Sequence, residues 1–141
     1  LFAGESPSDE SRIRLISKRA LLENDIDLYR LIGNVDLLIT DYSSVYFDYL
    51  LLERPIVFTP TDLEEYKKKR GFLLEPYDFW TPGPKVFTQE QLQDGIIRSF
   101  KNRDYYRKER EAINDIINHY KDDHSCERVT KMILEKLSRE K

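Results

Sequence analysis

Two short apolar runs, separated by one helix-length segment, constrain the fold more than any other feature of this sequence. The runs cover residues 36–40 and 55–59, and each is too short for a helix. Residues 43–53 between them are apolar on nearly every side, as in a helix that packs on a sheet. This order predicts a βαβ unit with two buried parallel strands and a right-handed crossover.

The remaining periodicity is mainly helical. Residues 27–35 carry an amphipathic stripe that Asp27 opens and Gly33 and Asn34 end, and Ser125 precedes the last stripe as its expected N-cap. Further helices are expected over 64–70, from Thr88 onward and over 105–120, with a short extended segment over 13–16. Strands that alternate with helices predict an α/β fold, a Rossmann-like open parallel sheet with helices on both faces.

Length and composition fit one soluble globular domain. Of 141 residues, 40% are hydrophobic and 35% charged, which supplies enough apolar surface for a core. Turn formers in residues 1–10 predict a loop, so we expect a leading segment over 1–12 and one domain over 13–141. The sequence does not begin with Met, which favours an excised fragment. No apolar run approaches the ~18 residues of a membrane span, and no secretory signal is visible.

Charge and cysteine content exclude several function classes. The net charge of -3, from 23 Lys and Arg against 26 Asp and Glu, gives no basic field for a nucleic acid. Cys126 is the only cysteine, so no internal disulfide can form, and one Cys with two His offers no metal-ligand spacing. We therefore expect no structural metal, no cofactor and no nucleic-acid partner.

The most informative segment is the turn that follows the first apolar run. Thr40, Asp41, Ser43 and Ser44 stand where a parallel strand meets a helix, and ligands of open α/β sheets bind at this end of the strands. Unpaired N–H groups at the start of the helix could donate hydrogen bonds to phosphate oxygens, with hydroxyl groups as further donors. The alternative, which the spacing alone favours, is that Asp41 or Ser43 merely caps the helix.

The surrounding motifs resemble the CDP-glycerol glycerophosphotransferase family, which includes teichoic acid primases and polymerases. The resemblance rests on residues 39–50, 54–56, 62–66, 70–72 and 82–84, in the order and rough spacing that the family shows, and it covers roughly residues 27–128. It implies the C-terminal half of a GT-B fold, which holds the CDP moiety of CDP-glycerol or CDP-ribitol. The transferred group would be a polyol phosphate, added to a teichoic-acid-like or capsular polymer.

The same resemblance implies a set of donor-binding residues. They are Thr40, Asp41, Ser43, Ser44, Glu64, Arg70, Gly71, Ser125 and Arg128. Arg70 could fork onto a phosphate while Gly71 lets the backbone approach closely, although the neighbouring lysines suit a solvated helix face. Glu64 and Glu65 could instead pair with lysines along a helix surface.

Three aromatic residues precede the turn-forming residues 82–84, which could form either a rigid loop or a cleft wall. Tyr77, Phe79 and Trp80 could stack on a base or an acceptor, or pack against the sheet, and packing is favoured.

No catalytic residue is assigned to this sequence. The family's catalytic histidines are implied to lie upstream, and neither His119 nor His124 matches them. Asp123 stands where the family pattern has a glycine, which puts the contacts inherited by the following residues in doubt.

The resemblance also implies a polyol-phosphate acceptor, bound by the N-terminal half of the protein, which would precede this sequence. It further implies a cytoplasmic location, at the inner face of the bacterial plasma membrane. Residues 105–108 suit either peripheral membrane contact or a solvated helix face, and the second is favoured. Two other functions remain open. One is a non-catalytic binding or dimerisation module, and the other is half of a sugar-nucleotide glycosyltransferase.

Overall fold

The computed structural model describes residues 12–139, which fall into two compact units. The first, Leu1–Val35, contains α1 (Lys18–Glu23) and α2 (Leu28–Ile32) among its described residues. Each helix has a side-chain N-cap: Ser17 Oγ accepts from the Ala20 N–H, and Asp27 Oδ1 accepts from the Tyr29 N–H. The predicted helix opened by Asp27 is therefore confirmed, although it spans only five residues.

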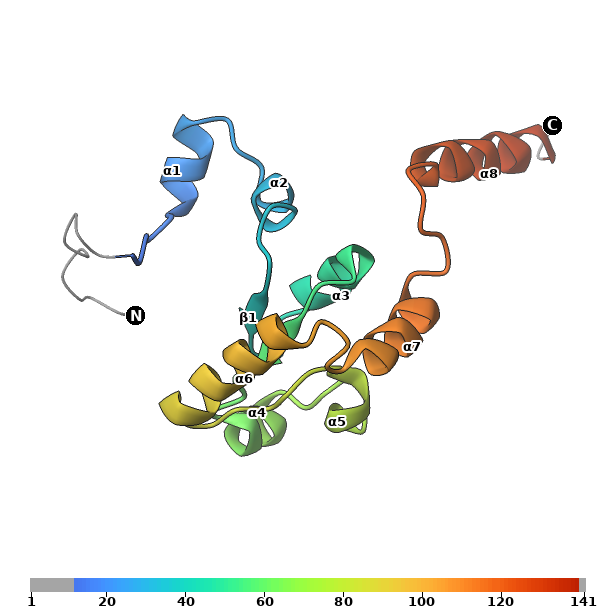
Figure 1. Ribbon diagram of the computed structural model, residues 1–141. Coiled ribbons are helices and arrows are strands. Elements are labelled where there is room, and N and C mark those ends of the chain that lie inside the picture. Colours follow the sequence, from blue (N-terminus) through green and yellow to red (C-terminus); the bar gives the residue numbers. More distant parts are fainter. Residues whose placement is uncertain (1–11, 140–141) are drawn as a thin grey trace. The chain divides into compact units, whose positions relative to one another are not determined.

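The second unit, Asp36–Lys141, carries the sheet and most of the helices (Figure 1). Its elements are β1 (Leu38–Thr40), α3 (Val45–Tyr49), the 3₁₀ helix η1 (Leu50–Leu52), β2 (Ile56–Phe58), α4 (Leu63–Lys69), α5 (Tyr77–Trp80), α6 (Gln89–Lys101), α7 (Arg107–Ile117) and α8 (Ser125–Arg139). The predicted α/β class is confirmed.

The two strands form the predicted parallel pair. Leu38 lies opposite Ile56 and Thr40 opposite Phe58, with α3 and η1 as the crossover. All of β2 is buried, but Ile39 of β1 is 44% exposed, so the prediction of two fully buried strands is wrong for β1. The reason is the alternation of side chains along a strand: Ile39 points to the opposite face from its neighbours, and no described element covers that side chain fully.

The sheet continues beyond β2 through the segment 82–86. The Phe58 N–H donates to the Pro84 carbonyl at 2.9 Å, and the Val86 N–H donates to the Phe58 carbonyl at 2.8 Å. Pro82, Gly83 and Pro84 are all buried, so this segment packs directly on the strand. These three residues are therefore packed against β2, while their role as a cleft wall stays a prediction.

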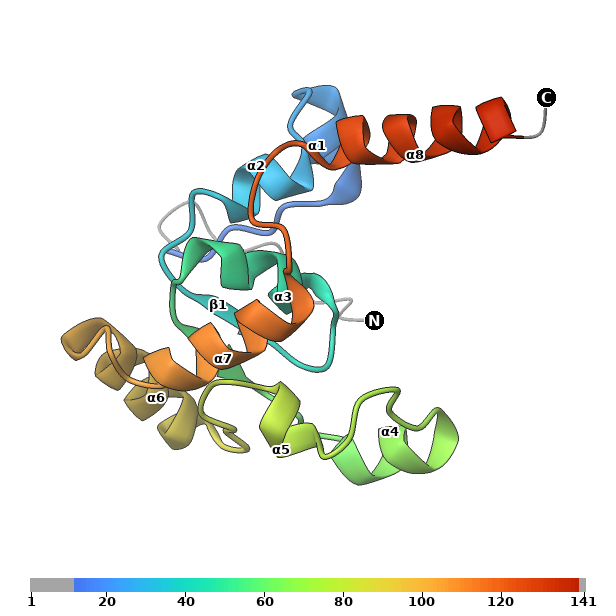
Figure 2. The same ribbon diagram turned by 90° about the vertical axis from the view of Figure 1, so that its right-hand side faces the viewer.

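Helix α7 is fixed to the crossover by two long-range hydrogen bonds. Asn114 Nδ2 donates to the Leu50 carbonyl at 3.2 Å, and Asn118 Nδ2 donates to the Phe47 carbonyl at 3.0 Å. Figure 2 shows α7 lying along α3 as these bonds require. Together with the buried Tyr49 and Ile113, they hold the C-terminal end of the crossover in place.

The other helix predictions are also confirmed. Helices α4, α6, α7 and α8 match the expected segments within a few residues, and Thr88 caps α6 by accepting from the Gln91 N–H. The N-cap expected at Ser125 is wrong, because Ser125 is already the first residue of α8 and the His124 carbonyl accepts the first helical hydrogen bond, from the Arg128 N–H. The extended prediction for residues 13–16 is wrong, since they form no strand and their side chains are exposed. Alternation favours a strand only where a partner strand is available.

Some predictions remain outside what the structure tests. The predicted loop over 1–10 lies outside the described residues, and a single domain over 13–141 stays a prediction. In the described part of the chain, no helix is both long and apolar enough to cross a bilayer.

Candidate functional site

The turn between β1 and α3 is held from both ends. The Thr40 carbonyl accepts from the Thr59 N–H at 2.8 Å and from Thr59 Oγ1 at 3.3 Å, which ties the end of β1 to the end of β2. Asp41 Oδ1 accepts from the Ser43 N–H at 2.9 Å, closing an Asx turn. Thr40 and Asp41 thus shape the turn.

The start of α3 is left without a side-chain cap. Ser44 occupies the N-cap position, but no side chain caps the first N–H groups. No described residue accepts from the Ser44 or Val45 N–H, and the hydroxyls of Ser43 and Ser44 make no hydrogen bond within residues 12–139. The alternative in which Asp41 or Ser43 caps the helix is therefore wrong. The Asp41 carboxylate accepts from the Ser43 N–H, which precedes the helix, and not from an N–H group of α3.

A cavity of about 370 Å³ opens beside this turn and includes Ser44 in its wall. Its other lining residues come from the turn itself, α3, α4, the loop after α4, α5 and the residue after α5. They are Tyr42, Tyr46, Phe47, Tyr66, Gly71, Phe72, Leu73, Leu74, Tyr77, Trp80 and Thr81. The rings of Tyr42 and Tyr66 stack with centroids 4.1 Å apart, and Phe72 stacks on Tyr66 at 5.3 Å. The hollow is therefore walled by a continuous aromatic cluster.

Two tyrosines of the cavity wall are shielded enough for burial to change their pKa. Loss of solvent raises the pKa of Tyr46 and of Tyr77 above the ordinary tyrosine value. Tyr46 Oη donates to the Trp80 carbonyl at 3.1 Å, which joins α3 to α5. The Tyr42 hydroxyl is shielded from solvent and has no hydrogen-bond partner among the residues described. A buried polar group in that state is uncommon and calls for a partner.

Arg70 and Gly71 lie where α4 ends, and Gly71 forms part of the cavity wall. Gly71 has φ +70°, and its N–H donates to the Lys67 carbonyl at 3.0 Å, so it terminates the helix in the left-handed region that glycine favours. A Cβ there would meet nothing within 4 Å, and the backbone is thus open at this point. Arg70 is exposed, and no described carboxylate pairs with its guanidinium.

Glu64 does not line this cavity. It is exposed in the first turn of α4 and borders a separate hollow with Lys67 and Glu75, which are joined by an ion pair of 3.2 Å. Its neighbour Glu65 pairs with Lys69 four residues later. For Glu65 the helix-surface reading is confirmed.

Ser125 and Arg128 are not brought into the cavity wall either. Arg128 donates through both Nη atoms to the Asp122 carboxylate, at 2.7 and 3.1 Å, and its guanidinium lies 3.9 Å from the Tyr120 ring centroid. This pairing lowers the pKa of Asp122 to about 2. Asp123 is not among the described residues with positive φ, so its position does not require glycine.

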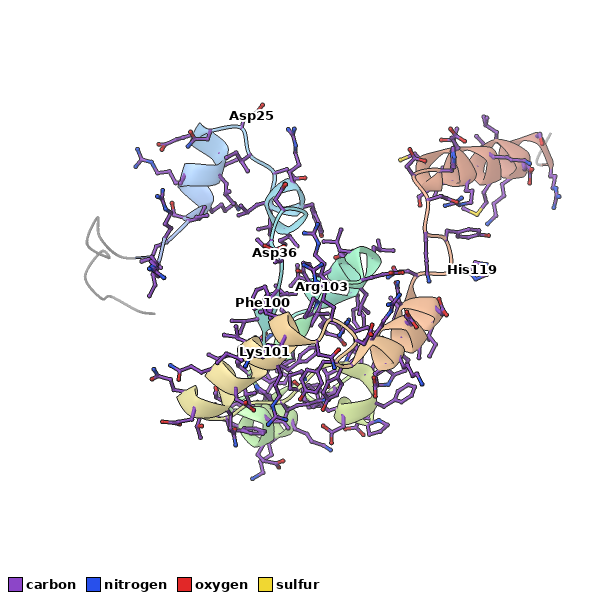
Figure 3. The ribbon with its side chains drawn as sticks, in the orientation of Figure 1. Asp25, Asp36, Phe100, Lys101, Arg103 and His119 are labelled. Atoms are coloured by element: carbon purple, nitrogen blue, oxygen red, sulfur yellow. The ribbon has the colours of Figure 1, made fainter. Side chains whose placement is uncertain are left out.

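Neither histidine lies at the turn or in the cavity wall. His119 falls between α7 and α8 (Figure 3), and its ring meets the Tyr120 ring edge-on. His124 Nδ1 is 3.1 Å from a carboxylate oxygen of Glu127, which lies in the first turn of α8. No role in catalysis follows from either position.

The aromatic cavity is the part of the site that the sequence reasoning missed. Tyr42, Tyr66 and Phe72 are present in the family-like motifs, but only the fold brings their rings together. Phe79, by contrast, is 51% exposed and lies outside the cavity wall. The sequence did contain one signal for this cavity, since aromatic residues recur in the turns and helices that follow the two strands.

Comparison with known proteins agrees with this geometry. Residues 7–135 match the family described as CDP-Glycerol:Poly(glycerophosphate) glycerophosphotransferase. The teichoic acid ribitol-phosphate polymerase TarL of Staphylococcus aureus (strain NCTC 8325 / PS 47) is 30% identical over 129 residues, 89% of this chain and 22% of TarL. The teichoic acid glycerol-phosphate primase of Bacillus subtilis (strain 168) is 36% identical over 106 residues, 75% of this chain and 26% of the primase.

A solved structure of the wall teichoic acid polymerase TagF superposes with a TM-score of 0.67 at 29% identity, covering 84% of this chain and 29% of TagF. A second TagF structure, described as containing CDPG, gives a TM-score of 0.66 at 28% identity, covering 83% of this chain and 29% of TagF. This chain thus spans less than a third of the length of these relatives. The chain belongs to the CDP-glycerol:poly(glycerophosphate) glycerophosphotransferase family.

Proposed function

We propose that this chain is the donor-binding half of a polyol-phosphate transferase that builds teichoic-acid-like or capsular polymer. The donor would be CDP-glycerol or CDP-ribitol, with its diphosphate at the turn between β1 and α3. Transfer of the polyol phosphate from such a donor to an acceptor hydroxyl releases CMP. Family membership supports the reaction class, and the turn supports the position of the donor.

One observation supports the proposed position of the diphosphate. The Asx turn at Asp41 consumes the Ser43 N–H but leaves the N–H groups of Ser44 and Val45 free, beside two serine hydroxyls. These two N–H groups and two hydroxyls place four hydrogen-bond donors around one turn. They suit phosphate oxygens, each of which accepts several hydrogen bonds. Donors that are already in place would stabilise the charge that develops on the departing CMP phosphate.

Arg70 is the candidate for a charged contact that the structure supports best. It follows α4, next to the open backbone of Gly71, and carries a guanidinium without a described ion-pair partner. A guanidinium meets two phosphate oxygens in a planar fork, which a lysine cannot do. Glu64, Ser125 and Arg128 remain proposed donor contacts. They do not line the cavity, so they would meet the donor from its other side or after closure of a second domain.

The acceptor and the catalytic base are proposed to be supplied by residues outside this sequence. None of the residues around the turn is a histidine, and the carboxylate of Asp41 already accepts from the Ser43 N–H. A polyol-phosphate acceptor and peripheral contact with the cytoplasmic face of the bacterial membrane complete the proposal. Its support is the likeness to teichoic acid polymerases and primases.

Titration of the ¹⁵N-labelled chain with CDP tests the placement. The amide resonances of Ser43, Ser44 and Val45 should move together, with weak affinity because a partner domain adds its contacts only on closure. Ser44→Ala should weaken binding, whereas Ser138→Ala, an exposed serine on α8 whose hydroxyl donates to the Glu135 carbonyl, should not. Resonances of the turn that stay still at saturating CDP would contradict the proposal.

A non-catalytic association module is the second candidate, because α8 presents apolar side chains that no described residue buries. Those about half exposed are Val129, Met132, Ile133, Leu134 and Leu137. An apolar stripe of this kind favours association with another surface. Sedimentation that shows a tight dimer, combined with no response to CDP, would favour this candidate over donor binding.

A further inference from the structure

Helix α5 separates two cavities. Tyr77 and Trp80 line the cavity beside Ser44, whereas Asp78 and Phe79 line a second cavity of about 290 Å³ that extends to α7. The helix has only four residues, none of them is buried, and no side chain caps its start. A single helical turn is not stable by itself, so contacts with neighbouring elements must hold α5 in place.

Lys85 contacts α5 from the second cavity. Its Nζ donates to the Thr81 carbonyl at 2.6 Å and to the Asp78 carbonyl at 3.2 Å. The residues on either side of Lys85 are hydrogen-bonded to Phe58 of β2, so the backbone of the lysine is itself fixed. Its ammonium therefore ties the end of α5 to the sheet, where the exposed carbonyls of a helix favour a positive charge.

The two carbonyls are the main partners of the Lys85 ammonium. The Asp78 carboxylate lies 3.9 Å from Nζ and is 86% exposed, so this ion pair contributes little. The Lys85 side chain is only 18% exposed. Burial lowers the pKa of Lys85 below the ordinary lysine value of 10.5, while the Asp78 and Glu109 carboxylates act in the opposite direction. Hydrogen bonds from a charged donor are about twice as strong as neutral ones, so these two contacts are well suited to anchor a short helix.

A second contact holds the same end of α5 from α3, where Tyr46 Oη donates to the Trp80 carbonyl. From these two contacts we infer that Lys85 is a positioning residue for donor binding, which fixes Tyr77 and Trp80 in the wall beside the turn. Lys85 does not line that cavity, so it acts only through α5. The inference rests on the proposed function, because the wall and the diphosphate turn meet at Ser44.

A displaced α5 should weaken donor binding without removing any group that touches the ligand. If the wall is in its binding-competent position for only part of the time, the apparent affinity falls in proportion to that fraction. Tyr46 still holds one carbonyl of the helix when Lys85 is lost. We therefore expect a moderate loss of affinity, of about 3- to 10-fold, and not an abolished site.

Three variants of the full chain test this role in the CDP titration of the Ser44 amide resonance. Lys85→Met keeps a long side chain but removes the charge and the N–H groups, and it should weaken CDP about 3- to 10-fold. Lys85→Arg keeps both and should bind CDP within about 2-fold of the parent chain. Lys108→Met makes the same change at an exposed lysine of the same cavity, and it should leave the affinity unchanged.

Trp80 reports on the wall directly because it is the only tryptophan in the sequence. In the absence of ligand, Lys85→Met should shift the emission maximum of Trp80. Lys85→Arg and Lys108→Met should leave it where it is in the parent chain. Far-UV circular dichroism of each variant shows whether the chain remains folded.

The pH dependence of CDP affinity provides a test that needs no disruptive variant. The affinity of the parent chain should fall as the pH rises through the lowered pKa of Lys85, whereas Lys85→Arg keeps its charge and should show no such fall. The other ionisable residues of this cavity are common to both chains, so the comparison isolates position 85. They are Asp78, Tyr106, Lys108 and Glu109.

The possible failures are distinguishable. If CDP moves the Ser44 resonance of the parent chain and binds folded Lys85→Met equally tightly, only the inference is overturned. If Lys85→Met does not fold, the pH profiles decide, and identical profiles for the parent chain and Lys85→Arg would overturn the inference. If CDP moves no resonance of the turn in the parent chain, the proposed function itself fails and the inference falls with it.

Discussion

Replacement of Gly83 by alanine should strongly destabilise the second unit. A Cβ at this position would lie 2.2 Å from the Ile56 carbonyl oxygen and 3.1 Å from a ring carbon of Phe58. The oxygen belongs to the backbone of β2, which is fully buried and cannot move aside cheaply. The loop must instead retreat by about 1 Å to restore an ordinary contact distance.

The loss in free energy of unfolding can be estimated from the packing and the hydrogen bonds that this movement of the loop disturbs. Overpacking of a buried site costs about 1–3 kcal/mol. The retreat also strains the two hydrogen bonds between Phe58 and the segment 84–86, at 2.9 and 2.8 Å, each contributing about 1 kcal/mol. The free energy of unfolding should therefore fall by about 3–5 kcal/mol, a large share of the ~5–15 kcal/mol of a typical domain.

Urea unfolding followed by Trp80 emission and far-UV circular dichroism measures this change. With a slope of about 1–3 kcal/mol per molar urea, the midpoint of Gly83→Ala should drop by at least about 1 M. Gly95→Ala is the matched control: its Cβ would meet only side-chain carbons at 3.6 to 3.7 Å, inside α6, and alanine should stabilise by up to about 1 kcal/mol. Equal midpoints for Gly83→Ala and the parent chain would refute the reasoning.

Three further outcomes follow from the contacts of the second unit. Asn114→Ala should cost about 1–3 kcal/mol in urea unfolding, because it removes two hydrogen bonds, one from Asn114 Nδ2 to the Leu50 carbonyl and one from Asn118 Nδ2 to Asn114 Oδ1, and an unchanged midpoint would contradict this. Thr88→Ala should cost about 1 kcal/mol through loss of the α6 cap, whereas Thr88→Ser should be nearly neutral in the same assay. Asp122 has a folded pKa of about 2, below its ordinary 3.8, because Arg128 stabilises the charged carboxylate. The stabilisation from this pair should therefore be complete above about pH 4 and disappear as the pH falls through 2. A carboxyl ¹³C titration of Asp122 with its midpoint near 4 would argue against the pairing.

Local sequence patterns predicted the elements that carry the site. The βαβ unit follows from apolar runs whose lengths and spacing are themselves local, and the turn of Thr40 to Ser44 follows from where the first run stops. The helix cap at Thr88 is equally local. These predictions needed no knowledge of which segments meet in space.

The cavity could not be predicted in this way because its wall depends on tertiary packing. The stacking of Tyr42 on Tyr66 joins the end of β1 to α4, and no periodicity within either segment indicates it. The partner of Arg128 could not be predicted either. Its neighbourhood resembles a donor-binding segment, but only the fold shows that its guanidinium donates to the Asp122 carboxylate through both Nη atoms.

A crystal structure of this chain with CDP tests the central claim most directly. The account predicts diphosphate oxygens within hydrogen-bond distance of the Ser44 and Val45 N–H groups, at the uncapped start of α3. Diphosphate density at another surface, such as the Arg128 segment, with the Ser44 turn unoccupied, would contradict it.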